Sequence, residues 1–149
     1  MASDSRSPAH RNDPAVIREA LTTPATWAVV GLSQNRCRTA YRIADFLVSQ
    51  LDMRVVPVHP DAPTVFGQQG YAVLGDIPDG TVVEVVDFFV RSQLVGAVVD
   101  EAIAQRERLG IRTLWLQLGV IDHPAAARAE AAGLQVIMDT CPKMEWPLP

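Results

Sequence analysis

Short, almost entirely apolar segments recur along this chain, and they limit its possible folds more than any other feature. Such segments are typical of strands that are buried on both faces of a parallel sheet. The segments are Thr26–Gly31, Arg54–Val58, Val82–Val90, Thr113–Gln117 and Leu134–Met138. Tyr71–Leu74, which lies among glycines, is expected to form a short edge strand. The sequence therefore predicts a sheet of about five to six strands.

Segments with helical signals precede or separate these strands. Asp13 followed by Pro14 is typical of a helix start, and this helix is expected to end near Thr22. Apolar residues at helical spacing predict a second helix over Thr39–Leu51. Two more helices are marked by a cap and a closing glycine, Ser92 with Gly110 and Asp122 with Gly133. The predicted fold is α/β, a Rossmann-like, doubly wound parallel sheet with helices on both faces.

The totals fit one domain and exclude several classes of protein. A chain of 149 residues can bury a core without disulfides, and Cys37 and Cys141 lack the spacing of a metal or redox motif. A net charge of −4 without a basic run argues against a general nucleic-acid binder. No apolar run approaches the roughly 18 residues of a membrane span. Residues 1–12 are polar without a secretory signal, so we expect a flexible tail before a soluble, cytoplasmic domain at 13–149.

The predicted topology also predicts where a ligand binds. In doubly wound sheets, ligands lie beyond the carboxyl ends of the strands, where the strand order reverses beside the first strand. Five loops should meet there: Gly31–Thr39, Val58–Pro63, Phe89–Ser92, Gln117–Asp122 and Asp139–Glu145. Trp115 lies inside a predicted strand, so we expect it in the core rather than in this crevice.

The loop after the first strand has the outline of a phosphate site. Gly31 permits a tight turn, Ser33 offers a hydroxyl, and the predicted helix at Thr39 offers free backbone N–H groups to an anion. Guanidinium groups pair with phosphate oxygens through two parallel hydrogen bonds. We expect at least one of three arginines to contact phosphate, without a choice between Arg36, Arg38 and Arg42.

A nicotinamide dinucleotide is the less favoured ligand. The loop has one glycine where the GxGxxG fingerprint needs three. The end of the second strand has no acidic residue for the ribose hydroxyls and instead reads Pro57, Val58, His59 and Pro60. Prolines there give an apolar wall with a neutral or cationic tip, which suits an adenine ring better than a ribose diol.

Seven segments in unbroken order carry a family resemblance. They are Val30–Ser33, Val56–Pro60, Phe66–Gly67, Asp76–Pro78, Val86–Arg91, Leu114–Val120, and Val136–Asp139 with Cys141. Together they resemble the bacterial CoA-binding-domain family of small standalone proteins, which is similar to the CoA-binding domain of the succinyl-CoA synthetase α subunit. The resemblance runs from about Asp13 to Glu145. This sequence departs from the family pattern at His59, usually asparagine, at Thr39, often serine, and at Thr140, usually arginine.

The resemblance implies how coenzyme A would lie. Its phosphates would bind at the loop 31–39, its adenosine towards His59 and Pro60, and its pantetheine past Phe89 and Val90 towards residues 117–119. With the crevice rule, this gives the expected contacts: Gly31, Leu32, Ser33, Arg36, Arg38, Thr39, Arg42, Pro57, Val58, His59, Pro60, Phe89, Val90, Arg91, Gln117, Gly119, Val120 and Cys141. No catalytic or metal-ligating residue is expected.

The function expected from these residues is binding of CoA or an acyl-CoA, non-catalytic or regulatory, because no triad, metal set or carboxylate pair is assembled. An acyl-CoA enzyme, with Cys141 or His59 as its reactive group, remains open, as does a subunit of a larger acyl-CoA-using enzyme. For Cys141, we favour a place in the packing or at the crevice rim. A homodimer also remains possible.

Overall fold

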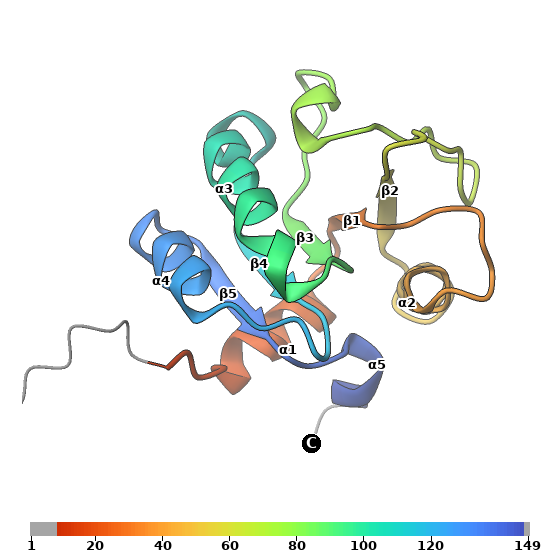
Figure 1. Ribbon diagram of the computed structural model, residues 1–149. Helices are drawn as coiled ribbons and strands as arrows, with labels where there is room; N and C mark the ends of the chain where they lie inside the picture. The colour runs from red at the N-terminus through yellow and green to blue at the C-terminus, as the bar shows by residue number, and fades with distance from the viewer. Residues whose placement is uncertain (1–8, 148–149) are drawn as a thin grey trace, which may run out of the picture.

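The computed structural model describes residues 9–147, which form one parallel sheet between two layers of helices (Figure 1). The strands run in the spatial order β2-β1-β3-β4-β5. Their bounds are β1 Thr26–Val30, β2 Arg54–Val58, β3 Val85–Phe88, β4 Thr113–Leu116 and β5 Gln135–Met138. All four neighbouring pairs are parallel. The predicted Rossmann-like α/β class is confirmed, with five strands.

The helices begin and end close to their sequence signals. Their bounds are α1 Pro14–Thr22, α2 Thr39–Ser49, α3 Ser92–Leu109, α4 His123–Ala131, α5 Pro142–Glu145 and the 3₁₀ turn η1 Leu74–Asp76. The Asp13 carboxylate accepts a hydrogen bond from the amide of Ala15, and the Asp122 carboxylate accepts one from Ala125. Gly110 has the left-handed conformation that ends α3.

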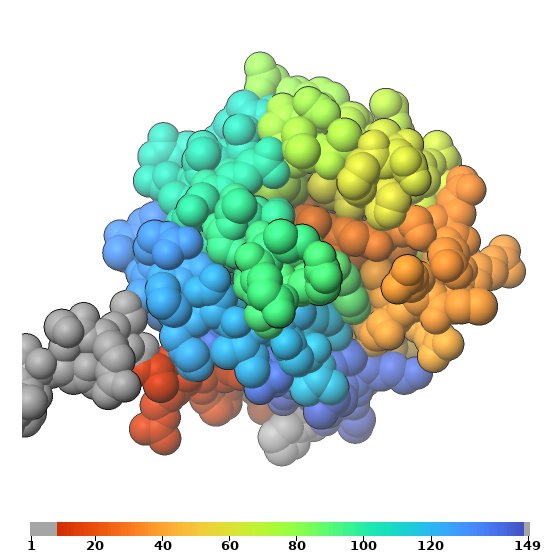
Figure 2. Space-filling model, in the orientation of Figure 1, coloured from red at the N-terminus to blue at the C-terminus, as the bar shows by residue number. Residues whose placement is uncertain are grey.

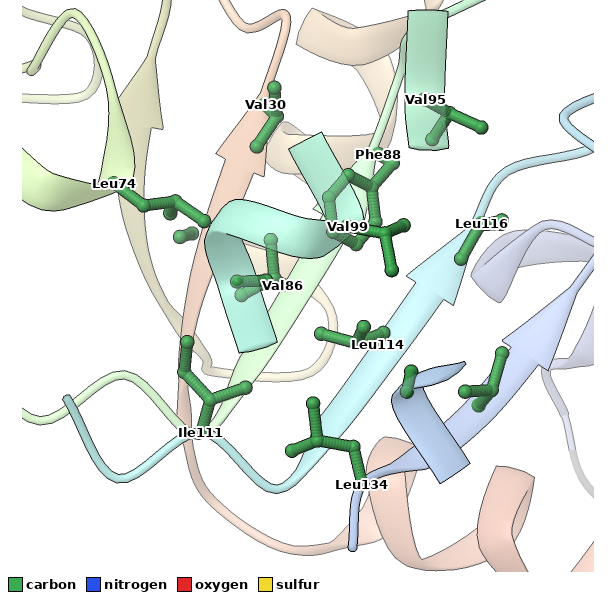
Figure 3. Packing of buried hydrophobic residues seen from close by; sticks show 14 of the residues in the cluster. Val30, Leu74, Val86, Phe88, Val95, Val99, Ile111, Leu114, Leu116 and Leu134 are labelled. Atoms are coloured by element: carbon green, nitrogen blue, oxygen red, sulfur yellow. The ribbon is translucent and has the colours of Figure 1, made fainter. Parts of the chain in front are cut away.

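Each face of the sheet has its own apolar layer. Helices α3 and α4 cover one face, where Phe88, Leu114 and Leu116 pack beneath Val95 and Val99 (Figure 3). The other face packs against α1, α2 and α5, and its cluster includes both buried strand tryptophans. Burial of these apolar side chains away from water contributes most of the free energy that holds the layers together.

Trp115 is fully buried in the second cluster, so its predicted place in the core is confirmed. Its ring centroid is 5.7 Å from that of Trp27, and its indole Nε1 donates a 2.9 Å hydrogen bond to the Thr140 carbonyl. This bond ties the loop after β5 to the core.

Two local predictions are wrong. Tyr71–Leu74 is not a strand: Tyr71 makes a single bridge to Val58, and Leu74 begins η1. Ser92 is the first residue of α3 rather than its N-cap, which is Arg91. The physical reason lies in the Ser92 hydroxyl, which donates to the carbonyl of Gly119 and accepts from the amide of Ile121. It joins two loops instead of closing its own helix.

The predicted N-terminal tail falls partly outside the described residues, which begin at residue 9. Within them, the Asn12 carboxamide donates to the carbonyl of Met138 and accepts from its amide, as an added strand would. His10 donates its amide to His123 in α4. Among residues 9–147, no helix is long and apolar enough to cross a membrane.

Candidate functional site

The strand order places the topological switch between β1 and β3, because the chain crosses from β1 outward to β2 and then back to β3. On the face shown in Figure 2, the loop after β1 (orange), the start of α3 (green), the loop after β4 (light blue) and α5 (dark blue) meet. Two adjoining cavities lie at the strand ends and share Thr39 and Phe89 in their walls. All five predicted loops contribute to them.

The β1–α2 cavity has a volume of about 580 Å³ and a polar lining. Its walls are Gly31, Ser33, Asn35, Arg38, Thr39, Ala40, His59, Asp61 and Phe89. The wall thus includes an arginine, two hydroxyl residues and the start of α2, a donor set that suits an anion, together with Asp61.

Gly31 permits the close approach of two strand ends in this cavity. Its φ is +100°, and an added Cβ would lie 2.6 Å from the carbonyl oxygen of Phe89. Its amide donates a 2.7 Å hydrogen bond to Val58 on the other side. Only glycine combines this backbone conformation with this lack of space. Gly31 therefore draws β2, β1 and β3 together beneath the cavity.

The first turn of α2 faces the cavity with unused donors. Arg38 is the N-cap, and within the described residues no side chain caps this end of the helix. Thr39 and Ala40, the first two helical residues, line the cavity. The positive end of the helix dipole and its free N–H groups favour an anion at this position.

Ser33 and Asn35 hold the loop in place. The Ser33 hydroxyl accepts from the amide of Asn35 at 3.2 Å, and the Asn35 side chain accepts from the amide of Cys37 at 3.0 Å. The Ser33 hydroxyl therefore keeps its own hydrogen for a partner in the cavity. Asn35 is a residue that the sequence interpretation missed.

His59 lines the opposite wall of the β1–α2 cavity. Its Nδ1 accepts a 3.2 Å hydrogen bond from the amide of Asp61, so in the neutral ring the proton resides on Nε2. The Asp61 carboxylate lies 3.7 Å from the same Nδ1. Asp61 was also missed, because it lies beyond the position where a ribose-binding acid is expected.

The β4–α5 cavity, about 490 Å³ in volume, has a different lining. It consists of Thr39, Phe89, Val90, Arg91, Gln117, Leu118, Gly119, Val120, Cys141 and Met144. Most of these side chains are apolar, so the cavity suits a flexible, largely uncharged segment of a ligand better than a phosphate.

Hydrogen bonds between loops fix the shape of the β4–α5 cavity. The Asp139 carboxylate accepts a 2.8 Å bond from the amide of Gly119, while the Gly119 carbonyl accepts from the Ser92 hydroxyl. The loops after β3, β4 and β5 are thereby joined. Asp139 has a φ of 61°, a conformation that aspartate adopts more readily than most residues.

Gln117 and Cys141 are the buried polar groups of this wall. Gln117 is only 4% exposed, and its Oε1 has no hydrogen-bond partner within residues 9–147. Cys141 is a free thiol, 8% exposed, at the N-cap of α5. A buried amide oxygen without a partner costs about 1–3 kcal/mol.

The predicted contacts divide among four places. Twelve of the eighteen line one or both cavities: Gly31, Ser33, Arg38, Thr39, His59, Phe89, Val90, Arg91, Gln117, Gly119, Val120 and Cys141. Arg36 and Arg42 instead line a groove between α2 and α5, together with Tyr41, Lys143 and Trp146. Leu32, Pro57 and Val58 are buried in the body of the fold, and Pro60 is exposed outside both cavities.

Volume alone does not select these cavities. A hollow of about 640 Å³ lies along α1 and is lined by residues of that helix together with Thr23 and Glu145. The two cavities at the switch point are preferred because loops from every strand converge there.

A comparison with known protein families is consistent with a ligand site at these strand ends. A model of the CoA-binding domain matches residues 25–147, most of the chain. This chain belongs to the CoA-binding domain family. The resemblance seen in the seven sequence segments is therefore confirmed, and the match spans all five strands of the CoA-binding domain.

Several solved structures have a similar fold. A hypothetical protein from Pyrococcus horikoshii OT3 is 31% identical with a TM-score of 0.78, covering 96% of this chain and 95% of that one. A protein from Thermus thermophilus, cell-free ID.343, is 26% identical with a TM-score of 0.74, covering 87% and 92%. The dinucleotide-forming acetyl-coenzyme A synthetase 1 of Ca. Korarchaeum cryptofilum, apo form, is 22% identical with a TM-score of 0.66, covering 83% of this chain and 28% of that chain.

A buried acid lies beneath the switch point of this CoA-binding domain. Asp87, in the middle of β3, is fully buried, and neither carboxylate oxygen has a partner within the described residues. Burial raises the pKa of Asp87 well above its ordinary value, although the nearby backbone of Phe88 acts in the other direction. Burial therefore favours the protonated form of Asp87, which lies inside the sheet two residues before Phe89 of both cavities.

Proposed function

We propose that this protein binds CoA or an acyl-CoA across the two adjoining cavities, with the phosphates in the β1–α2 cavity and the pantetheine in the β4–α5 cavity. The observation that carries the proposal is the uncapped start of α2 opposite Gly31, with Arg38 in the same wall. A location in the cytoplasm is part of this proposal.

Arg38 is the arginine that we assign to a phosphate. It lines the β1–α2 cavity beside the free amides of Thr39 and Ala40, whereas Arg36 and Arg42 line the α2–α5 groove. A guanidinium next to a helix N-terminus gives two positive contributions at one point. The Arg42 guanidinium is already engaged, because it donates to the carbonyl of Cys37 at 3.3 Å.

The adenosine is proposed to lie against the end of β2. His59 contributes an Nε2–H donor and a ring face to this wall. The absence of an acid at the first position after β2 favours a nucleotide whose ribose carries a 3′-phosphate over one with a free diol.

The pantetheine is proposed to pass Phe89, which lines both cavities, and to end near Gln117 and Cys141. Pantetheine alternates short apolar linkers with two amides and ends in a thiol. The apolar side chains Val90, Leu118 and Val120 suit the linkers, and the unpartnered Gln117 Oε1 suits an amide N–H.

We propose binding without catalysis by the isolated chain. His59 and His123 line other cavities than Cys141 does. The Cys141 thiol therefore has no histidine beside it in its cavity to act as a base. A role as one domain of a larger acyl-CoA enzyme is the second candidate, favoured by the fold shared with the acetyl-CoA synthetase of Ca. Korarchaeum cryptofilum. Co-purification with a partner subunit, and acyl-CoA turnover only in its presence, would support that candidate.

A thermal-shift comparison tests the binding proposal. The purified protein is heated with CoA, dephospho-CoA, acetyl-CoA, NAD or ATP at matched concentration and salt. A ligand at 100 times its Kd stabilises the native state by about 2.7 kcal/mol. We expect the largest rise in Tm with CoA or acetyl-CoA and a smaller one with dephospho-CoA. A rise with NAD alone, or with none of the five, would contradict the proposal.

A further inference from the structure

A free thiol and an amide whose buried oxygen has no partner among residues 9–147 share one wall of the β4–α5 cavity. Cys141 is 8% exposed and lines the cavity without a disulfide partner. Gln117 is 4% exposed, lines the same cavity, and leaves its buried Oε1 without a hydrogen bond in the described part of the chain. A buried oxygen without a protein partner calls for an explanation, and a polar ligand group in this cavity is one.

The ligand proposed for this cavity itself ends in a thiol. If the pantetheine amide bonds to Gln117, the sulfur lies one short linker further along the cavity that Cys141 also lines. A cysteine held beside the sulfur of a bound ligand has a high effective concentration towards it. The pair is therefore placed for exchange chemistry rather than for binding alone.

We propose that Cys141 captures the disulfide form of CoA as a mixed disulfide, a modification that depends on the binding function proposed above. The Cys141 thiol loses its proton, and the thiolate attacks one sulfur of CoA disulfide. A new S–S bond forms between Cys141 and one CoA while the original S–S bond breaks. The second CoA leaves as a thiolate and takes up a proton, so no further oxidant is needed.

Burial makes this capture selective. Disulfides that do not fit the β4–α5 cavity reach a thiol with 8% exposure poorly, whereas a ligand bound in the cavity is delivered to it. Cys37 is the internal contrast: it is exposed, belongs to the loop after β1 and lines neither cavity. Cys37 is open to any disulfide, without selection by the site.

Gln117 acts as a positioning residue in this step. It touches neither reacting sulfur and instead fixes how deep the pantetheine lies. Replacing it with leucine keeps the volume of the wall but removes the amide. The variant Gln117→Leu is therefore expected to slow exchange with CoA disulfide and to leave exchange with a small disulfide such as cystamine unchanged.

The test uses full-length Cys37→Ser, which leaves Cys141 as the one thiol in the chain. The reduced protein is incubated with CoA disulfide or with glutathione disulfide, and intact mass and peptide mapping follow the modification. We expect a mass increase of one CoA less two hydrogens on Cys141, reversed by dithiothreitol, and formed about tenfold or more faster than the glutathione adduct. Cys141→Ser, with Cys37 retained, should show no such preference for CoA disulfide.

Three outcomes would overturn the inference: equal rates with both disulfides, no adduct, or no slowing in Gln117→Leu. The proposed function is read separately, from the rise in Tm that reduced CoA gives in Cys37→Ser under dithiothreitol. A rise in Tm without an adduct refutes the exchange alone, and the absence of both refutes the binding function as well.

Discussion

The two cavities at the switch point differ in how the chain builds them. The β1–α2 cavity depends on the backbone: a glycine turn, the first amides of α2, and Arg38 at the N-cap. The β4–α5 cavity depends on side chains, mostly apolar, around one unpartnered amide and one thiol. Backbone dipoles recognise charge regardless of what carries it, whereas a shaped apolar wall recognises length and the positions of a few polar atoms.

This contrast assigns different tasks to the two cavities. The β1–α2 cavity should supply most of the affinity, with a strong dependence on salt, because it pairs charges. The β4–α5 cavity should supply selection among ligands that carry the same phosphates. Substitutions in the β1–α2 cavity should consequently weaken every ligand that carries the phosphates. Substitutions in the β4–α5 cavity should weaken only ligands that also carry the pantetheine.

The largest effect is expected for Gly31→Ala. Its added Cβ would meet the Phe89 carbonyl at 2.6 Å, so the ends of β1 and β3 must separate. Gly133→Ala is the matched control, since Gly133 also has a positive φ, +91°, but open space around it. The control should lose about 1–3 kcal/mol of stability from backbone strain, and Gly31→Ala should lose more, together with CoA binding. Urea unfolding and CoA titration of both variants make the comparison, and equal losses would contradict it.

Arg38→Ala is expected to have the next largest effect. Loss of a hydrogen bond to a charged group costs about 1.5–3 kcal/mol, which is roughly tenfold to a hundredfold in Kd. Arg42→Ala removes the same charge from the α2–α5 groove and should change the Kd little. Calorimetry at low and high salt should show a weaker salt dependence in Arg38→Ala. If Arg42→Ala weakened binding as much, the assignment of the phosphates to the β1–α2 cavity would be wrong.

Gln117→Leu should have a smaller effect on the Kd for CoA. Loss of one hydrogen bond worth about 1 kcal/mol raises the Kd for CoA about fivefold. Adenosine 3′,5′-bisphosphate lacks the pantetheine, so its Kd should be the same in both proteins. The free variant should be at least as stable as the wild type, because the substitution removes a buried oxygen without a partner. Titrations measure the Kd of both ligands. Equal losses of affinity for CoA and for the bisphosphate would contradict the separate tasks of the two cavities.

Asp87→Asn should affect stability and leave both cavities nearly unchanged. Burial raises the folded-state pKa of Asp87, so the folded protein keeps a proton that the unfolded chain has already released. The free energy of unfolding therefore falls as pH rises from the ordinary aspartate pKa to the raised one, and the loss persists above it. Asp87→Asn should remove this fall and be the more stable protein at neutral pH. Chemical unfolding across pH measures it, and an unchanged pH profile would contradict a raised pKa of Asp87.

The sequence predicted the order of strands and helices because local signals mark them. Asp13 and Asp122 cap their helices as their positions indicated, and Gly110 ends α3. Tyr71–Leu74 failed because its pattern is too short to distinguish a strand from a bridge followed by a turn. Ser92 failed because its hydroxyl found partners in a loop 27 positions away in the chain, which no local pattern reports.

For the site, the sequence predicted the loops better than the side chains. The crevice rule depends only on topology, so all five loops were placed together. The choice among Arg36, Arg38 and Arg42 depends on where α2 begins and which way each residue leaves the helix, and a difference of one residue changes both. Asn35 was missed because its role is to bond the backbone within its own loop.

Asp87 was missed for another reason. The sequence of an apolar strand does not show whether an aspartate side chain lies in the core or at the surface, because strand side chains point to either face of the sheet. Its burial follows from the central position of β3 between β1 and β4.

An amide NMR titration of the labelled protein with CoA tests most directly whether one ligand occupies both cavities. We expect the amides of Gly31, Thr39 and Ala40 to shift together with those of Gly119 and Val120, and adenosine 3′,5′-bisphosphate to shift only the first group. Shifts confined to one cavity at saturating CoA, or centred on the α2–α5 groove around Ser49 and Gln50, would contradict it.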